Sequence, residues 1–173
     1  MTRGGHNATA LALAVAGAIV CSWPAAAAWA IGCMLGAAAP DYLEIEYGMG
    51  RGRKALIRHR TLTHQPFLWM LAIFYIQTSH IDPLVKMLAL GWACAALLHL
   101  AMDILTPVGI PLGWPWGDRT SLKIFRTGGT EWPVIFLVWL IATVAVALKL
   151  SEKHPEIAKI FSSIPLFRGI FNA

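Results

Sequence analysis

The chain has 173 residues, of which 57% are hydrophobic and only 13% are charged, and its formal net charge is +5. A soluble domain is usually about 45–50% apolar and about 25% charged, so this composition argues against an ordinary soluble domain and favours a single membrane-embedded one. No zinc-finger, winged-helix or repeat pattern accompanies the basic charge, and we therefore expect positively charged membrane loops and no nucleic-acid binding.

Five apolar segments follow one another along the chain, and we expect each to form a helix that crosses or enters the membrane. They cover residues 8–22, 25–39, 67–78, 84–102 and 133–148, and Trp23-Pro24 separates the first two as a turn. A segment of 15 residues reaches only about 22 Å at 1.5 Å per residue. The first two segments are therefore expected to form a shallow hairpin or to thin the bilayer around them.

The expected fold is an all-α integral membrane bundle with about five transmembrane segments. Residues 1–150 are predicted to form the embedded domain, and residues 151–173 an amphipathic tail, within which 157–171 suits a helix in the membrane interface. Nine Lys and Arg residues lie on the side that holds the amino terminus and the loops 40–66 and 104–130, against five on the other. The first side is therefore expected to face the cytoplasm.

Histidines and acidic residues recur at those segment ends that an up-and-down chain brings to one membrane face. His99 and Asp103 end the fourth segment four positions apart, so they share one side of a helix. An ionisable residue in an apolar helix is costly and usually functional, the alternative being a hydrogen-bonded pair that packs two helices. The residues that reach the same face from other segments are His6, Asp41, His59, His64 and Glu131.

Together these residues predict a metal site. Imidazole nitrogen and carboxylate oxygen suit Zn²⁺, and Mn²⁺ or Fe²⁺ are possible instead. His59 and His64 are five positions apart and cannot share one helical face, so at least one should lie in a loop, where Thr63 is a candidate cap for the third segment. The predicted ligands, which can hold one ion or two, are His6, Asp41, His64, His99 and Asp103.

The segment 106–116 is rich in proline and glycine, which forbid a helix there. Trp114 and Trp116 suit the headgroup level of a membrane. We expect a rigid loop that either lines a substrate groove or closes the end of the bundle.

Several of these pieces resemble the YdjM-like family of bacterial inner-membrane metal-dependent hydrolases. The resemblance rests on Gly5-His6, on Ala39-Pro40-Asp41, on the run from His59 to His64 and on the run from His99 to Pro115. Glu131 stands where the family tends to carry a glutamate. The chain departs from the family pattern at Leu43, where a second acid is usual, and at Gln65, where a serine is common. A looser likeness connects the order of these motifs to zinc-dependent phospholipases C.

The resemblance implies a metal-dependent hydrolase of the bacterial inner membrane, with a phosphoester or other ester of a lipid as the expected substrate. In such an enzyme a divalent ion polarises the scissile group and activates water. Glu131 is the candidate general base, Arg60 the candidate phosphate-binding residue, and His59 a further catalytic residue or a sixth ligand. The alternatives are a membrane protein with a structural metal or a transport or scaffold role, and a soluble helical protein with a large core. The substrate and the oligomeric state do not follow from the sequence.

Overall fold

The structure is a computed structural model that describes residues 1–43, 46–47, 54–55, 61–154 and 156. This part of the chain is all-α except for two pairs of two-residue antiparallel strands. The elements are α1 (Arg3–Ala18), α2 (Trp23–Gly36), α3 (Ala39–Tyr42), β1 (Glu46–Tyr47), β2 (Lys54–Ala55), the 3-10 helix η2 (Leu62–His64), α4 (Pro66–Thr78), α5 (Pro83–Ile104), β3 (Ile110–Pro111), β4 (Arg119–Thr120) and α6 (Trp132–Lys153).

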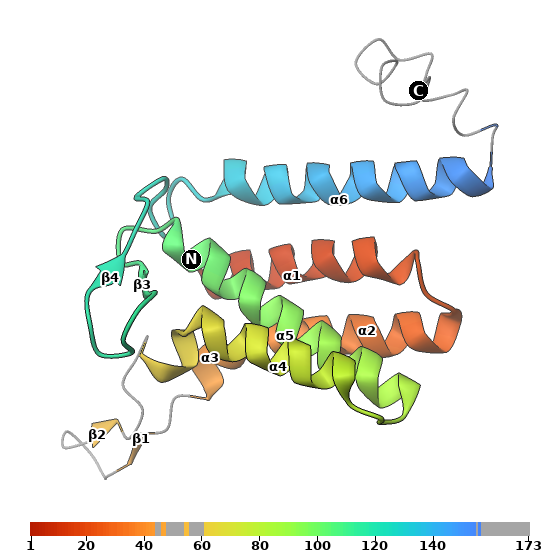
Figure 1. Cartoon of the computed structure of the whole chain (residues 1–173). Helices are drawn as coiled ribbons and strands as arrows, with labels where there is room; N and C mark the ends of the chain where they lie inside the picture. Colours follow the sequence, from red (N-terminus) through yellow and green to blue (C-terminus); the bar gives the residue numbers. More distant parts are fainter. Residues whose placement is uncertain (44–45, 48–53, 56–60, 155, 157–173) are drawn as a thin grey trace.

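The five long helices correspond to the five predicted apolar segments, and their chain path alternates in direction (Figure 1). The all-α prediction is therefore confirmed. Two of these helices, α5 and α6, are long and apolar enough to cross a membrane, whereas α2 and α4 are apolar but shorter. The predicted interfacial helix at 157–171 lies outside the described residues.

The structure differs from the sequence-based predictions at three points near the site. The first helix begins at Arg3, because the Thr2 hydroxyl accepts a hydrogen bond from the Gly5 amide and caps it, so His6 lies within the helix and not before it. Asp41 lies in the single-turn helix α3, where Pro40 is tolerated because a proline at a helix start gives up no hydrogen bond. Thr63 does not cap α4, whose N-cap is Gln65.

Helices α2 and α5 pack closely because glycines stand at their contact. A methyl group on Gly32 would lie 2.1 Å from the carbonyl oxygen of Leu88, and one on Gly36 would lie 2.1 Å from that of Trp92. Small residues spaced by four let two helix backbones touch. Because α3 begins three residues after α2 ends, this contact also sets Asp41 beside the last turns of α5.

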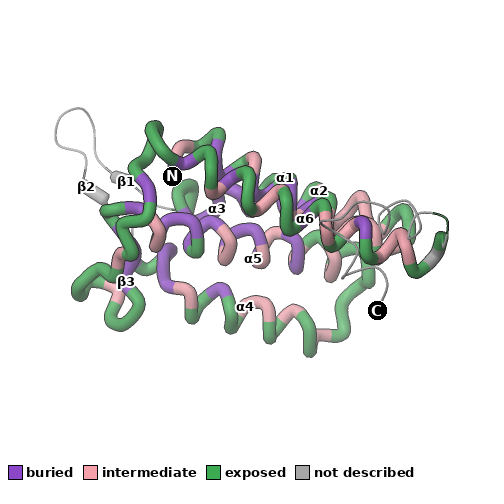
Figure 2. The backbone as a smooth tube through the Cα atoms, turned by 90° about the horizontal axis from the view of Figure 1, so that it is seen from above, coloured by how far each residue is buried: buried purple, intermediate pink, exposed green. Residues whose placement is uncertain are grey.

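The outer helices expose large apolar side chains in place of the charged face that a soluble bundle needs. Phe74 of α4 is 66% exposed and Phe136 of α6 is 69% exposed. Figure 2 shows that burial is concentrated along α5 and on the sides of the other helices that face it. Contiguous apolar surface of this kind suits a lipid environment and argues against the soluble alternative.

Candidate metal centre

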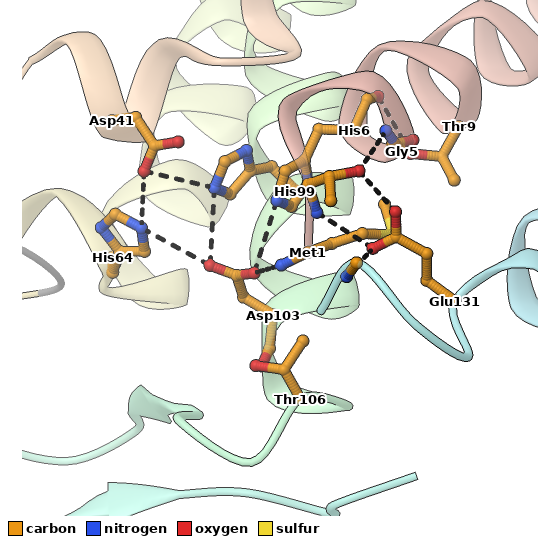
Figure 3. A network of polar contacts seen from close by, with 12 residues as sticks. Met1, Gly5, His6, Thr9, Asp41, His64, His99, Asp103, Thr106 and Glu131 are labelled. Atoms are coloured by element: carbon orange, nitrogen blue, oxygen red, sulfur yellow. Dashed lines mark hydrogen bonds and ion pairs between the residues drawn. The ribbon is translucent and has the colours of Figure 1, made fainter. Parts of the chain in front are cut away.

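Five side chains from four elements meet at the end of the bundle that also holds the amino terminus (Figure 3). The chain path predicted this meeting, and the contacts confirm it. The residues are His6 of α1, Asp41 of α3, His64 of η2, and His99 and Asp103 of α5.

Four of these residues place their ligand atoms around one point. The Oδ1 atom of Asp41 lies 3.4 Å from Nε2 of His64 and 3.7 Å from Nε2 of His99. The Oδ2 atom of Asp103 lies 3.6 Å from Nε2 of His99 and 3.8 Å from Nε2 of His64. Ligand atoms around one tetrahedral zinc ion lie about 3.3 Å apart, given bonds of ~2.0–2.1 Å. The arrangement is therefore only slightly wider than a zinc site requires.

His6 lies on the inner side of this group. Its ring stacks on the ring of His99, with centroids 3.6 Å apart and planes 9° from parallel. Its Nε2 atom lies 3.4 Å from Oδ1 of Asp103, an oxygen that is also 2.6 Å from the amino group of Met1. Two ligand triads result, an outer one of Asp41, His64 and His99 and an inner one of His6, His99 and Asp103.

Neighbouring groups orient the two outer histidines. Nδ1 of His99 lies 2.8 Å from the carbonyl oxygen of Ala37, so it carries the proton and leaves the Nε2 lone pair pointing into the cluster. The η2 turn that holds His64 is fixed by Trp69, whose Nε1 donates to the carbonyl oxygen of Thr63 at 2.8 Å. Neither Ala37 nor Trp69 could be recognised in the sequence, because Ala37 acts through a backbone carbonyl and Trp69 looks like an ordinary apolar residue.

The cluster residues differ in how far their side chains are exposed. His6, His64, His99 and Asp103 are each at most 3% exposed, whereas the side chain of Asp41 is 42% exposed. Of the five cluster residues, all of which the structure describes, only Asp41 has an exposed side chain. Solvent or a substrate therefore reaches the cluster past Asp41. This places the outer triad at the mouth of the site and the inner triad behind it.

Burial also changes the pKa values of His64 and Asp41, the two cluster residues that lie outside the long helices. Burial lowers the pKa of His64, and the contact with Asp41 only partly offsets this, so the imidazole is neutral near pH 7. Burial alone would raise the pKa of Asp41, but its hydrogen bond with His64 helps to hold it below its usual value, so the carboxylate is ionised. Neutral imidazole and ionised carboxylate are the forms that bind a metal.

The donor set fits a divalent metal ion. Nε2 of His99 and Nδ1 of His6 are buried and have no hydrogen-bond partner within the described part of the chain. Burying a polar atom unpaired costs free energy, and an ion at the cluster would satisfy the lone pair of His99. The mixed nitrogen and oxygen set suits Zn²⁺, Mn²⁺ or Fe²⁺ alike.

Glu131 lies beside the cluster but is turned to the start of the chain. Glu131 is only 4% exposed. Its carboxylate accepts a hydrogen bond from the Thr2 hydroxyl, and two more from the amides of Thr2 and Gly128 at 3.0 Å and 3.4 Å. None of the contacts found for it reaches a predicted ligand, so its role as general base stays a prediction. His59 and Arg60 lie outside the described residues.

Comparison with known proteins places the chain in a family without naming a reaction. No curated protein and no solved structure matches it. The sequence profile of the YdjM inner membrane protein family matches residues 1–171, nearly the whole chain. With its apolar helices and its gathered histidines and carboxylates, this chain belongs to the YdjM inner membrane protein family.

Proposed function

We propose that the chain is a multi-pass membrane hydrolase that depends on a divalent metal, most simply Zn²⁺, and acts on a phosphoester or other ester of a membrane lipid. The observation that carries the proposal is the outer triad. Its three ligand atoms lie within 4.8 Å of one another, and one of its members is open to the surroundings. A catalytic metal site keeps a position free for water or substrate, and three protein ligands at a mouth leave one.

The proposed membrane arrangement follows from the helix path. We take α1, α2, α4, α5 and α6 as the five segments in the membrane, with the cluster at the headgroup level of one face. The nine basic residues on that side favour the cytoplasm. Transport sites usually lie near the bilayer midplane on interrupted helices, whereas this cluster lies at helix ends, which favours an interfacial enzyme.

An ion in the outer triad would polarise the scissile group and lower the pKa of a bound water molecule. The chain's own residues would do the rest. Asp103 holds a carboxylate within 3.6 Å and 3.8 Å of the two outer histidines, where it can complete the ligand set or orient a water. Glu131 is the proposed general base, and Arg60 the proposed partner of a phosphate group, with His59 beside it.

A structural metal is the second candidate, and Asp103 is the observation that favours it. If Asp103 and the outer triad all bind one ion, four protein ligands saturate it, as in structural zinc sites. Cobalt(II) in place of zinc distinguishes the two cases, because its visible spectrum changes when an added ligand enters an open position. A spectrum that inorganic phosphate leaves unchanged would favour the structural role.

The first test is metal analysis of the protein purified in detergent. We expect about one bound ion per chain in the wild type, and loss of that ion in His64→Ala. His80→Ala is the matched control, since His80 is exposed and lies in the loop at the other end of the bundle.

Hydrolysis of phospholipids in vesicles, with and without chelator, then tests the reaction. A metal-loaded protein that releases no product from any phospholipid tested would count against the enzyme and for the structural role.

A further inference from the structure

An apolar groove begins at the exposed side of the cluster. Two adjoining cavities of about 460 and 240 Å³ form it, and they share Leu43 and Trp92 as walls. The first cavity lies between α2, α3 and α5, and the second between η2, α4 and α5. The groove therefore runs between α2 and α4, with α5 as its floor.

The groove is lined by close chain neighbours of two of the cluster residues. Its lining includes Ala39, two residues before Asp41, and Thr63, the neighbour of His64. Asp41 is also the ligand that the surroundings reach, as its 42% exposed side chain shows. A molecule lying in the groove would thus bring one end to the outer triad.

The length and direction of the groove match one leaflet of a bilayer. Its far end is marked by Leu88, eleven residues before His99 on α5. At 1.5 Å per residue this separation is about 16 Å along the helix axis, close to half of a hydrocarbon core that is ~30 Å thick. The groove therefore extends from the headgroup level to about the middle of the membrane.

The lining is almost wholly apolar, and none of the described residues in it is charged. A soluble ester would gain little from such walls, whereas a hydrocarbon chain can bury its length against them. The larger cavity also falls within the ~300–1,000 Å³ of typical small-molecule sites.

We propose that this groove holds one acyl chain of the lipid substrate, which enters sideways from the bilayer between α2 and α4 and presents its ester or phosphoester to Asp41 and His64. The inference rests on the proposed function and narrows it to a substrate with a long acyl chain. A lipid that arrives from the membrane needs no passage through water, which suits a groove that lies beside the ligands.

The test uses a phospholipid that carries a photoreactive diazirine in one acyl chain, in vesicles containing the purified protein. We expect labelling of peptides that contain Leu35–Leu43 and Leu88–Trp92. Ala89→Trp fills the groove from its floor, and Ala72→Trp fills it from the α4 side, so each should lose most of this labelling. Both variants should keep the bound zinc, since neither residue belongs to the cluster.

The matched control is Ala145→Trp, which places the same side chain in a separate apolar cavity between α1, α5 and α6. Groove labelling should be unchanged there. Equal labelling of the groove in wild type, Ala89→Trp and Ala72→Trp would overturn the proposal. Suppose instead that the groove is labelled in a protein that binds no metal, and that Ala89→Trp abolishes that labelling. This result would support the acyl-chain groove and reject the proposed enzyme, so the two failures are distinguishable.

Discussion

Nδ1 of His99 lies 2.8 Å from the carbonyl oxygen of Ala37, where α2 has just ended. A carbonyl oxygen only accepts hydrogen bonds, so this nitrogen carries a proton. His99 therefore has one lone pair to offer, at Nε2. Both triads need that lone pair, so an ion in the outer triad excludes a second ion that uses His99 in the inner triad.

The shared nitrogen gives a prediction that separates the two triads. His99→Gln should abolish zinc binding whichever triad is used. His6→Gln should leave about one zinc per chain and weaken its affinity by about 10–100-fold or less, because His6 then acts only by orienting Asp103. Metal analysis and titration against a chelator measure both. Complete loss of zinc in His6→Gln would identify the inner triad as the site and reject the outer one.

Trp69 provides a second prediction, because it acts on the site without touching an ion. Its indole N–H holds the carbonyl of Thr63, and its ring packs edge-on against Trp92 with centroids 4.8 Å apart. Trp69→Phe keeps most of the packing but removes the hydrogen bond that fixes the η2 turn. Zinc affinity, measured by chelator competition, should fall by about tenfold or more, as is typical when a ligand loses its orienting partner.

The matched control for Trp69 is Trp132→Phe, since Trp132 is 71% exposed at the start of α6. Its zinc affinity should equal that of the wild type. A normal zinc affinity in Trp69→Phe would mean that His64 is held by other contacts.

The sequence predicted the fold class and the meeting of five side chains for a physical reason. Long apolar runs have few structures available other than helices, because their backbone must satisfy its own hydrogen bonds. Their alternating path then fixes which ends meet. His99 and Asp103 were the clearest members because their spacing of four places both on one side of a helix.

Features that depend on backbone groups or on the exact start of a helix could not be predicted from the sequence. His6 looked like a residue before the first helix, and the cap at Thr2 was not anticipated. The partner of His99 is a main-chain carbonyl, which every residue possesses. The number of membrane crossings also stays a prediction for α1, α2 and α4, because they are shorter than a normal span.

Glu131 gives a prediction about stability and pH. Burial would raise its pKa, but the hydrogen bonds from Thr2 and Gly128 lower it overall, so the ionised form is favoured in the folded protein. A lowered pKa stabilises the fold above the ordinary glutamate pKa of about 4.3, and this stabilisation is lost as the pH falls through the folded-state pKa. Glu131→Gln should therefore lower stability at pH 7 by about 1–3 kcal/mol, with a smaller difference near pH 4.

Thermal unfolding in detergent at both pH values measures this effect. Glu152→Gln is the control, because Glu152 pairs with Lys149 on an exposed face of α6 and should contribute almost nothing. If Glu131→Gln were as stable as the wild type at pH 7 and had lost only catalysis, its role would be chemical and the base assignment would gain support.

The last prediction concerns the glycine contact that holds α3 beside α5. Gly36→Ala should destabilise the protein by about 1–3 kcal/mol, the usual cost of overpacking, because the new methyl group would lie 2.1 Å from the carbonyl oxygen of Trp92. Backbone atoms cannot yield unless the helices separate. Gly4→Ala in α1 is the matched control: nothing lies within 4 Å of the added methyl, so the higher helix propensity of alanine, worth up to about 1 kcal/mol, should dominate. Unfolding in detergent gives opposite signs for the two variants, and zinc affinity should fall only in Gly36→Ala, since only there does the shift reach Asp41. Two substitutions that stabilise alike would show that α2 and α5 do not approach this closely.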